Sequence, residues 1–262
     1  MTDRPHTLTG DIRSHEFHSS QFADDRTVIV YVPPSYATSN EHYPVLYLHD
    51  GQNVFDQATA FSTEWGVDET AQELITTGKI EPLIIVGIYN AGERRVDEYT
   101  PTASAETGGG RADDYGRMLV EELKPFIDAT YRTLPDVANT AMGGSSLGGL
   151  LTLHLGLRHP GTFGKLAVLS PSVWWDERVI VREVEALAEK PPQRIWLDAG
   201  TREGPDVIPD VRRLRDALVS KGWVIARDLM YGEARGGEHN ERSWSKRVGP
   251  FLKFLFPPRR TL

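Results

Sequence analysis

A chain of 262 residues, 39% hydrophobic and 25% charged, is long enough to bury one large core as soluble globular proteins do. Its formal net charge of −8 argues against nucleic acid or an anionic membrane as a partner, and no segment has the apolar length of a membrane span. The absence of cysteine excludes disulfides, thiolate catalysis and Cys-ligated zinc. Residues 1–17 contain no signal-like apolar stretch, so we expect a cytoplasmic protein.

The opening of the chain predicts a hairpin after a loose arm. Residues 1–10 show no periodicity and are expected to form the arm. Alternating apolar and polar side chains predict antiparallel strands at Ile12–Ser19 and Arg26–Val32. Asp24 and Asp25 provide the turn between them.

From residue 44 onward, apolar strands alternate with amphipathic helices. The predicted strands are Pro44–His49, Pro82–Ile88, Ala138–Met142, Lys165–Ser170, Arg194–Ala199 and Trp223–Tyr231. The predicted helices are Thr63–Thr76, Asp113–Thr130 (bent or broken near Pro125), Leu147–Arg158, Glu177–Glu189, Ile208–Lys221 and Arg242–Phe256. This order predicts a single α/β domain over residues 1–262, with a mostly parallel central sheet, an N-terminal antiparallel hairpin and helices on both faces.

One segment without periodicity, residues 90–112, interrupts this alternation. A loop of this length inside a compact domain is typically functional or mobile. Arg94, Arg95, Glu98 and Tyr99 lie in it and could contact a polar leaving group of a substrate. The alternative is an Arg–Glu pair that only shapes the loop.

The stretch Ala138–Leu153 has the pattern of a strand that turns abruptly into a helix. Its residues 144–148 match G-x-S-x-G around Ser146, because a frame centred on Ser145 would need glycine at position 147. Glycines two positions either side of a strained serine leave room where a Cβ atom would clash. A phosphate loop would carry lysine after its last glycine, where Gly149 stands. We therefore interpret Ser146 as a nucleophile.

A histidine and an acid are needed to activate such a serine. His239 lies in a Gly-rich loop between the last strand and the last helix, which favours it as the base. The acid is expected after the strand Arg194–Ala199, since the order serine, acid, histidine is typical of this arrangement. Glu203 is the favoured acid, with Asp198 and Asp206 as alternatives.

Backbone amides are expected to stabilise the oxyanion. Leu147 N–H follows the nucleophile directly, and the loop after the strand Pro44–His49 offers Gln52 N–H as the second donor. The side chains of that loop could equally be present for turn chemistry.

Together these motifs resemble the Putative esterase branch of the α/β-hydrolase fold, which includes enterochelin, feruloyl and acetylxylan esterases, esterase D and mycolyltransferases. The similar blocks are LYLHDGQNVFD (46–56), GGSSLGGL (143–150), SPSVWWD (170–176), LDAGTREG (197–204) and GGEHNERSW (236–244). The resemblance implies Ser146, Glu203 and His239 as the triad, and Gln52 and Leu147 as the oxyanion pair. Asp is common in this family at the position of the acid.

We therefore expect a serine esterase that hydrolyses a small or medium ester and needs no metal or organic cofactor. Trp174, Trp175 and Arg95 are candidate substrate contacts, although a tryptophan could instead belong to the core. Alternatives are acyl transfer to an alcohol or sugar by the same triad, and a non-catalytic binding domain.

A metallohydrolase is a further alternative. Its ligands would be His49, Asp50, Asp56, Glu238 and His239. The sequence lacks an HExxH or similar spacing, and His49 is better interpreted as a packed residue that orients the following loop.

Overall fold

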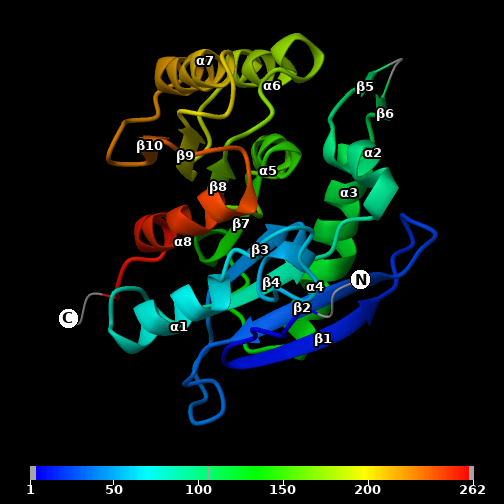
Figure 1. The fold of residues 1–262 in the computed structure, drawn as a ribbon, viewed down its shortest axis with the longest axis vertical. Coiled ribbons are helices and arrows are strands. Elements are labelled where there is room, and N and C mark those ends of the chain that lie inside the picture. The colour runs from blue at the N-terminus through cyan, green and yellow to red at the C-terminus, as the bar shows by residue number, and fades with distance from the viewer. Residues whose placement is uncertain (1–3, 105–106, 260–262) are drawn as a thin grey trace.

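The computed structural model describes residues 4–104 and 107–259. Its main sheet has eight strands in the order β1-β2-β4-β3-β7-β8-β9-β10 (Figure 1). The strands are β1 (Asp11–Phe17), β2 (Arg26–Val32), β3 (Val45–His49), β4 (Ile84–Ile88), β7 (Thr140–Ser145), β8 (Lys165–Leu169), β9 (Arg194–Gly200) and β10 (Leu229–Ala234). The hairpin β1–β2 and the pair β2–β4 are antiparallel, and all other pairs are parallel. The predicted α/β-hydrolase architecture is confirmed.

Helices cover both faces of this sheet (Figure 1). They are α1 (Val67–Thr76), α2 (Arg95–Tyr99), α3 (Ala112–Arg117), α4 (Lys124–Thr130), α5 (Leu147–Arg158), α6 (Trp175–Ala186), α7 (Val207–Ser220) and α8 (Glu241–Leu255). Alternate side chains of one strand enter opposite cores: Leu46 and Leu48 of β3 pack with α1 and α8, whereas Val45 and Tyr47 pack with α3, α4 and α5. A strand buried on both faces is therefore apolar throughout.

Two predicted elements begin at least four residues later in the structure than predicted. The helix predicted from Thr63 begins at Val67, because the backbone N–H groups of Trp65 and Val67 bind carbonyls of the preceding loop. The strand predicted from Trp223 begins at Leu229. Residues 226–228 form a turn, and Ile225 makes only an isolated bridge to Leu229, so the apolar residues at 223–225 lie outside the strand.

The strand before Ser146, β7, begins and ends later in the chain than predicted. It was expected at Ala138–Met142 and runs over Thr140–Ser145, after the 3₁₀ turn η4 (Val137–Asn139). The glycines at its end remain extended because β8 lies close: a Cβ atom on Gly143 would stand 2.8 Å from Cβ of Ala167. Close strand packing therefore extends β7 through residues that propensity alone would assign to a turn.

The helix predicted for Asp113–Thr130 is present as α3, a π-helical segment η3 (Met118–Leu123) and α4. Pro125 is the second residue of α4, two positions after the π segment ends. Proline has no N–H and its ring collides with the carbonyl four residues earlier, so a locally wider turn accommodates it without ending the helix.

The long loop is partly ordered into elements, which corrects the expectation of an irregular segment. It contains the 3₁₀ turn η2 (Gly92–Arg94), the helix α2, and a small hairpin of β5 (Ala103–Ser104) and β6 (Gly108–Gly109). Residues 105 and 106 lie outside the described residues. Short helices of this kind escape a search for amphipathic periodicity because they contain little more than one turn.

The predicted loose arm is also corrected for residues 4–10, while residues 1–3 lie outside the described residues. Arg4 Nη1 donates to the carbonyl oxygen of Ala60 at 2.8 Å, and Thr9 N–H donates to Asp68 Oδ2 at 2.7 Å. These bonds attach the segment to α1 and to the loop before it.

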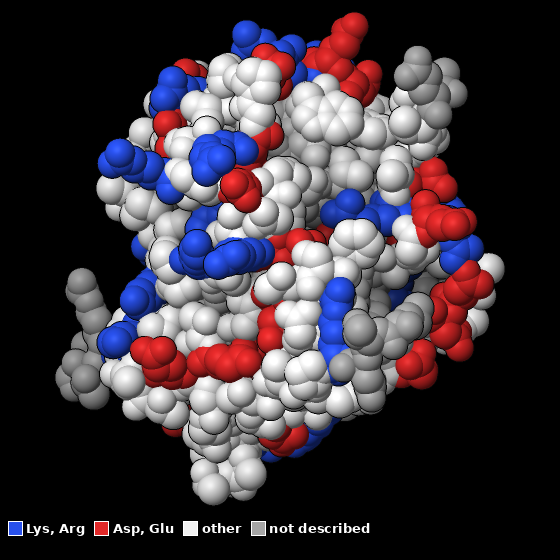
Figure 2. All heavy atoms as spheres, viewed as in Figure 1, with Lys and Arg blue, Asp and Glu red and all other residues white. Residues whose placement is uncertain are grey.

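Charged side chains of both signs are interspersed over the face drawn in Figure 2. That face therefore has no extended basic surface of the kind that binds nucleic acid. Among the described residues, no helix combines the length and apolarity needed to cross a membrane.

Candidate active site

Three neighbouring parallel strands end on strained residues. Asp50, Ser146 and Ser170 directly follow β3, β7 and β8, and their φ angles are 57°, 57° and 40°. Positive φ in a residue other than glycine is uncommon and tends to cluster at functional sites. Positive φ angles thus mark the carboxyl edge of the sheet, where a binding site is expected in an open parallel sheet.

Ser146 stands at the sharp turn between β7 and α5, with φ 57° and ψ −122°. The glycines on either side of it permit this turn: a Cβ atom on Gly144 would lie 2.9 Å from the backbone of Gly148. Ser145 is the last residue of β7 and is buried. Of the two serines, only Ser146 has its hydroxyl within hydrogen-bond distance of a histidine in the described structure.

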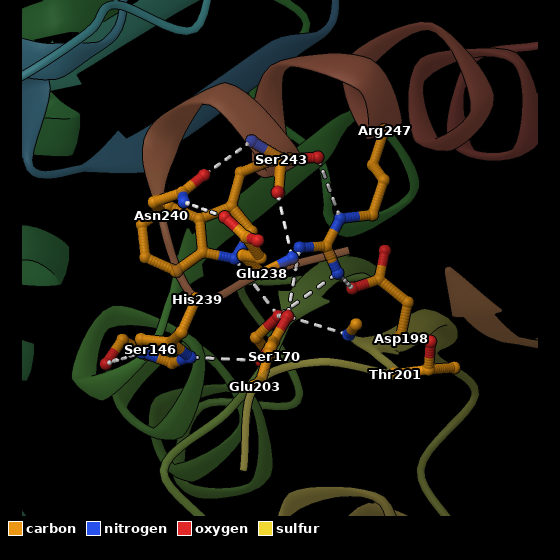
Figure 3. Close-up of polar contacts among 12 residues, drawn as sticks. Ser146, Ser170, Asp198, Thr201, Glu203, Glu238, His239, Asn240, Ser243 and Arg247 are labelled. Atoms are coloured by element: carbon orange, nitrogen blue, oxygen red, sulfur yellow. Dashed lines mark hydrogen bonds and ion pairs between the residues drawn. The ribbon is translucent and has the colours of Figure 1, made fainter. Parts of the chain in front are cut away.

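His239 bridges the serine and the acid (Figure 3). Its Nε2 atom lies 2.9 Å from Ser146 Oγ and its Nδ1 atom lies 3.0 Å from Glu203 Oε2. The Trp244 ring meets the imidazole edge-on, with the centroids 5.0 Å apart and the planes at 83°. The structure therefore brings the three predicted triad residues into one chain of hydrogen bonds from three separate loops.

Glu203 is the acid that reaches the imidazole. Burial alone would raise the pKa of this carboxyl, but hydrogen bonds from His239, from the Ser170 hydroxyl and from Gly200 N–H outweigh burial, so that its pKa lies below the ordinary value. Its side chain is fully buried. It is therefore held as a carboxylate at neutral pH.

The two alternative acids lie elsewhere. Asp198 is buried in β9, and burial raises its pKa to about 6. Its carboxylate accepts from Arg247 Nη1 at 2.6 Å and from Trp196 Nε1 at 2.7 Å. Asp206 is exposed at the start of α7. Among the described residues, neither carboxylate has a hydrogen bond to His239.

Sequence reasoning missed a polar layer behind Glu203. The Ser170 hydroxyl donates to Glu203 Oε1 at 2.7 Å and accepts from Trp244 Nε1 and Arg247 Nη1 at 3.0 and 3.1 Å. Arg247 Nη2 also approaches Glu203 Oε1 at 3.3 Å. The sequence contained an indication of this role for Arg247, because it lies on the apolar face of α8 with Val248. An arginine on such a face is buried only when its charge is paired.

The predicted oxyanion donors lie at two helix starts. Leu147 is the first residue of α5, and Gln52 is in η1 (Gly51–Asn53) after β3. The first N–H groups of a helix have no carbonyl partner within it, so amides at such positions can bind an anion. Gln52 and Ser146 line the same cavity of about 560 Å³.

The other predicted contacts divide between cavity and core. Arg95 lines this cavity, and its guanidinium binds the Asp50 carboxylate through two bonds of 2.7 and 2.8 Å. Trp174 is 60% exposed, beside a second cavity of about 260 Å³ that Glu203 also lines. Trp175 is buried, and its indole N–H donates to Thr102, so it belongs to the core.

The loop-internal Arg–Glu pair considered for residues 94–98 is not formed. Glu98 instead pairs with the buried Arg26 of β2 at 2.8 Å, and Arg94 pairs with Asp24. Tyr99 lies under the Arg95 guanidinium, with 4.9 Å to the ring centroid, and its hydroxyl accepts the Asp50 N–H at 3.1 Å. These contacts tie α2 to the strand ends.

His49 is packed, as the sequence suggested. It is 1% exposed, its Nδ1 atom lies 3.1 Å from the Tyr115 hydroxyl, and burial lowers its pKa to about 3. Among the described residues, no group of three histidine, aspartate or glutamate side chains is arranged to hold a metal ion. Of the hypothetical ligands, Asp56 binds His6 and His239 binds Glu203.

Comparison with known proteins agrees with this geometry. Residues 19–252 match the family described as Putative esterase. The chain belongs to this family. It is therefore a carboxylic ester hydrolase, on a fold of the α/β-hydrolase type.

Similar proteins carry esterase names. Ferri-bacillibactin esterase BesA of Bacillus subtilis is 32% identical over 69% of this chain and 67% of its own length. An endo-1,4-beta-xylanase/feruloyl esterase of Xylanibacter ruminicola is 28% identical over 94% of this chain, which spans about a third (31%) of that protein. The crystal structure of BES protein from Bacillus cereus superimposes with a TM-score of 0.78 at 21% identity, covering 98% of both chains, and this likeness concerns the fold alone.

Proposed function

We propose that this esterase cleaves its ester through an acyl-enzyme on Ser146, with His239 as the base and Glu203 as the acid. The observation that carries the proposal is the continuous path from Ser146 Oγ through the imidazole to a buried carboxylate, at 2.9 and 3.0 Å. A histidine bonded on both nitrogens has a fixed tautomer: Nδ1 donates to Glu203, which leaves Nε2 free to accept the serine proton.

Acylation follows from these positions. His239 Nε2 takes the Ser146 proton while Oγ forms a bond to the ester carbonyl carbon, and the carbonyl oxygen becomes an oxyanion that the N–H groups of Gln52 and Leu147 stabilise. The bond from carbon to the alcohol oxygen then breaks. His239 returns its proton to that oxygen, and the alcohol leaves.

Deacylation repeats these steps with water. His239 takes a proton from water as the water oxygen attacks the acyl carbon, and the second tetrahedral intermediate releases the acid while Ser146 recovers its proton. The Glu203 carboxylate stabilises the imidazolium during both halves. The reaction as written requires no metal or organic cofactor.

For the substrate, we propose a small or medium ester with a polar part beside the triad. The cavity next to Ser146 combines the Arg95 guanidinium and the Asn90 amide with the exposed ring of Phe61, and its volume of about 560 Å³ accommodates such a molecule. Relatives named for feruloyl and siderophore esters give the first compounds for a substrate panel.

The decisive experiment replaces the two adjacent serines separately. We expect Ser146→Ala to lose p-nitrophenyl acetate hydrolysis by a factor of about 10⁴ or more, because the covalent route disappears. Ser145→Ala, the matched control, retains turnover. Labelling of the wild type by a fluorophosphonate at residue 146, read by mass spectrometry, reports the nucleophile directly. Loss of activity confined to Ser145→Ala would refute the proposal, and faster product formation with added glycerol would favour acyl transfer.

A further inference from the structure

The two oxygens of Glu203 have different partners. Among the described residues, the one hydrogen-bond partner of Oε2 is His239 Nδ1, at 3.0 Å. Oε1 receives the Ser170 hydroxyl at 2.7 Å, Gly200 N–H at 2.7 Å and Arg247 Nη2 at 3.3 Å. A carboxylate anchored so heavily through one oxygen cannot rotate about its last bond, so its other oxygen keeps a fixed direction.

Arg247 joins this anchor to a second buried carboxylate. Its Nη1 atom lies 2.6 Å from Asp198 Oδ1 and 3.1 Å from Ser170 Oγ, and its Nε atom donates to the carbonyl of Ser243 at 3.2 Å. The side chain is only 7% exposed. Figure 3 shows the guanidinium between the two carboxylates, on the far side of Glu203 from Ser146. Only the planar fork of arginine can bind so many acceptors in fixed directions.

The net charge of Glu203, Asp198 and Arg247 favours protonation of His239 during the reaction. Above about pH 6, where Asp198 is mainly ionised, one guanidinium and two buried carboxylates leave one net negative charge behind the imidazole. That charge is neutralised when His239 takes the serine proton. Without Asp198 the guanidinium would cancel the charge of Glu203, and without Arg247 two carboxylates would stand unpaired in the interior.

We propose that Arg247 is a positioning residue of the triad: held by Asp198 and Ser170, it fixes the Glu203 carboxylate so that Oε2 faces His239, while Asp198 balances its charge. This inference rests on the proposed Ser146–His239–Glu203 mechanism. Arg247 acts through Glu203 and does not touch the substrate cavity.

Other charges near His239 must stay constant in a test by pH. Glu241 at the start of α8 and the Arg95–Asp50 pair line the cavity that His239 lines. Arg202 and Glu238 form an exposed pair at 3.7 Å in the adjoining loops. All of these stay in place when Arg247 or Asp198 is replaced, so a change in the pH profile reports the buried layer.

Two variants distinguish the effect of the net charge from the effect of the Glu203 position. Asp198→Asn keeps the Arg247 guanidinium but removes the negative charge that balances it, so the His239 imidazolium is less stable. We expect the acid limb of kcat/KM to move to lower pH by about one unit, the size expected for a unit charge changed at roughly 10 Å in an effective dielectric of about 20.

Arg247→Met combined with Asp198→Asn removes the fork but conserves the net charge. We expect the acid limb to stay where the wild type has it and kcat to fall about a hundredfold, since a small misplacement of a catalytic group has an effect of this size. KM stays unchanged in both variants, because neither residue lines the cavity beside Ser146.

Controls make each outcome decisive. Fluorophosphonate labelling counts folded sites, so a loss of kcat is measured per competent molecule. Lys124→Met removes a half-buried ion pair with Asp128 on α4, remote from the triad, and is expected to lower the melting temperature without moving kcat or the acid limb. If the double variant does not fold, Asp198→Asn still tests the charge balance.

An acid limb that stays in place in Asp198→Asn, or a kcat that stays at the wild-type value in the double variant, would overturn the inference and leave Arg247 as a structural ion pair. Ser146→Ala, assayed alongside, keeps the two hypotheses apart. Residual turnover at the wild-type level in that variant would contradict the proposed function itself, whatever the Arg247 variants do.

Discussion

Individual residues of the site are held in unfavourable backbone conformations. Asp50, Ser146 and Ser170 each have a positive φ, which costs about 1–3 kcal/mol per residue. Each is fixed by its surroundings: the Asp50 carboxylate binds Arg95, Ser146 N–H binds the carbonyl of Leu169, and Ser170 N–H binds that of Asp198. The strain places these side chains at the tips of turns, where Asp50 and Ser146 line the cavity and Ser170 contacts Glu203.

At the same scale, the identity of the acid can be tested by two isosteric changes. We expect Glu203→Gln to lower kcat/KM at least about a hundredfold, because the amide cannot stabilise the imidazolium and turns the ring toward the wrong tautomer. Asp206→Asn is the matched control, since that exposed carboxylate has no bond to His239. Initial rates with p-nitrophenyl acetate at saturating and limiting concentration give both constants. Equal losses in the two variants would show that the acid is assigned wrongly.

At the scale of elements, the loops after β9 and β10 support each other. Arg202 N–H donates to the carbonyl of Gly237 at 2.8 Å, and Thr201 N–H donates to that of Ala234 at 3.0 Å. These bonds connect the loop that contains Glu203 to the loop that contains His239. The two loops therefore fix the positions of Glu203 and His239 relative to each other.

This contact predicts the effect of one added methyl group. A Cβ atom on Gly200 would stand 2.6 Å from both Glu203 Oε1 and the carbonyl carbon of Gly237, so Gly200→Ala must push the two loops apart. We expect kcat to fall about tenfold to a hundredfold, with a lower melting temperature. In Gly232→Ala, on the neighbouring strand β10, no atom lies within 4 Å of the new methyl group, and we expect full activity. Wild-type kcat in Gly200→Ala would show that the loops are more tolerant than their packing indicates.

At the scale of the whole molecule, the N-terminal segment is fastened by a buried carboxyl. Asp68, on α1, is fully buried and accepts Thr9 N–H through Oδ2 at 2.7 Å. Among the described residues its Oδ1 atom has no hydrogen-bond partner. Burial, with the neighbouring carboxyl of Glu69, raises the pKa of Asp68 to about 8.

The contribution of Asp68 to stability should therefore fall as the pH rises. The folded state keeps the Asp68 proton up to about pH 8, whereas the unfolded chain releases it at the ordinary value near 3.8, so this group favours unfolding increasingly from about pH 4 up to about pH 8. We expect Asp68→Asn to flatten this dependence and to exceed the wild type by about 1–3 kcal/mol at pH 8. Urea unfolding at pH 5, 6.5 and 8 measures it. Parallel curves for the two proteins would contradict the expectation.

Much of the fold followed from local patterns. The continuous apolar strands, the helix Leu147–Arg158 and the glycine spacing around Ser146 each reflect short-range sterics or periodicity, which a single sequence expresses directly. Boundaries were weaker where packing overrides propensity, as in β7 and at the start of β10. Ser146 and His239 could be predicted because the strained turn requires the G-x-S-x-G spacing, and because His239 follows two glycines in a loop.

The sequence by itself determined the strand–helix alternation and which serine stands at the bend, because those depend on neighbours along the chain. Only the tertiary structure decided which carboxylate meets the imidazole, and that Arg247 and Asp198 stand behind it. Glu203, Asp198 and Asp206 lie within nine positions on one strand end and loop. Their separate environments arise from contacts with α8 and β8, more than twenty residues away in the chain, and long-range packing of this kind leaves no local pattern to detect.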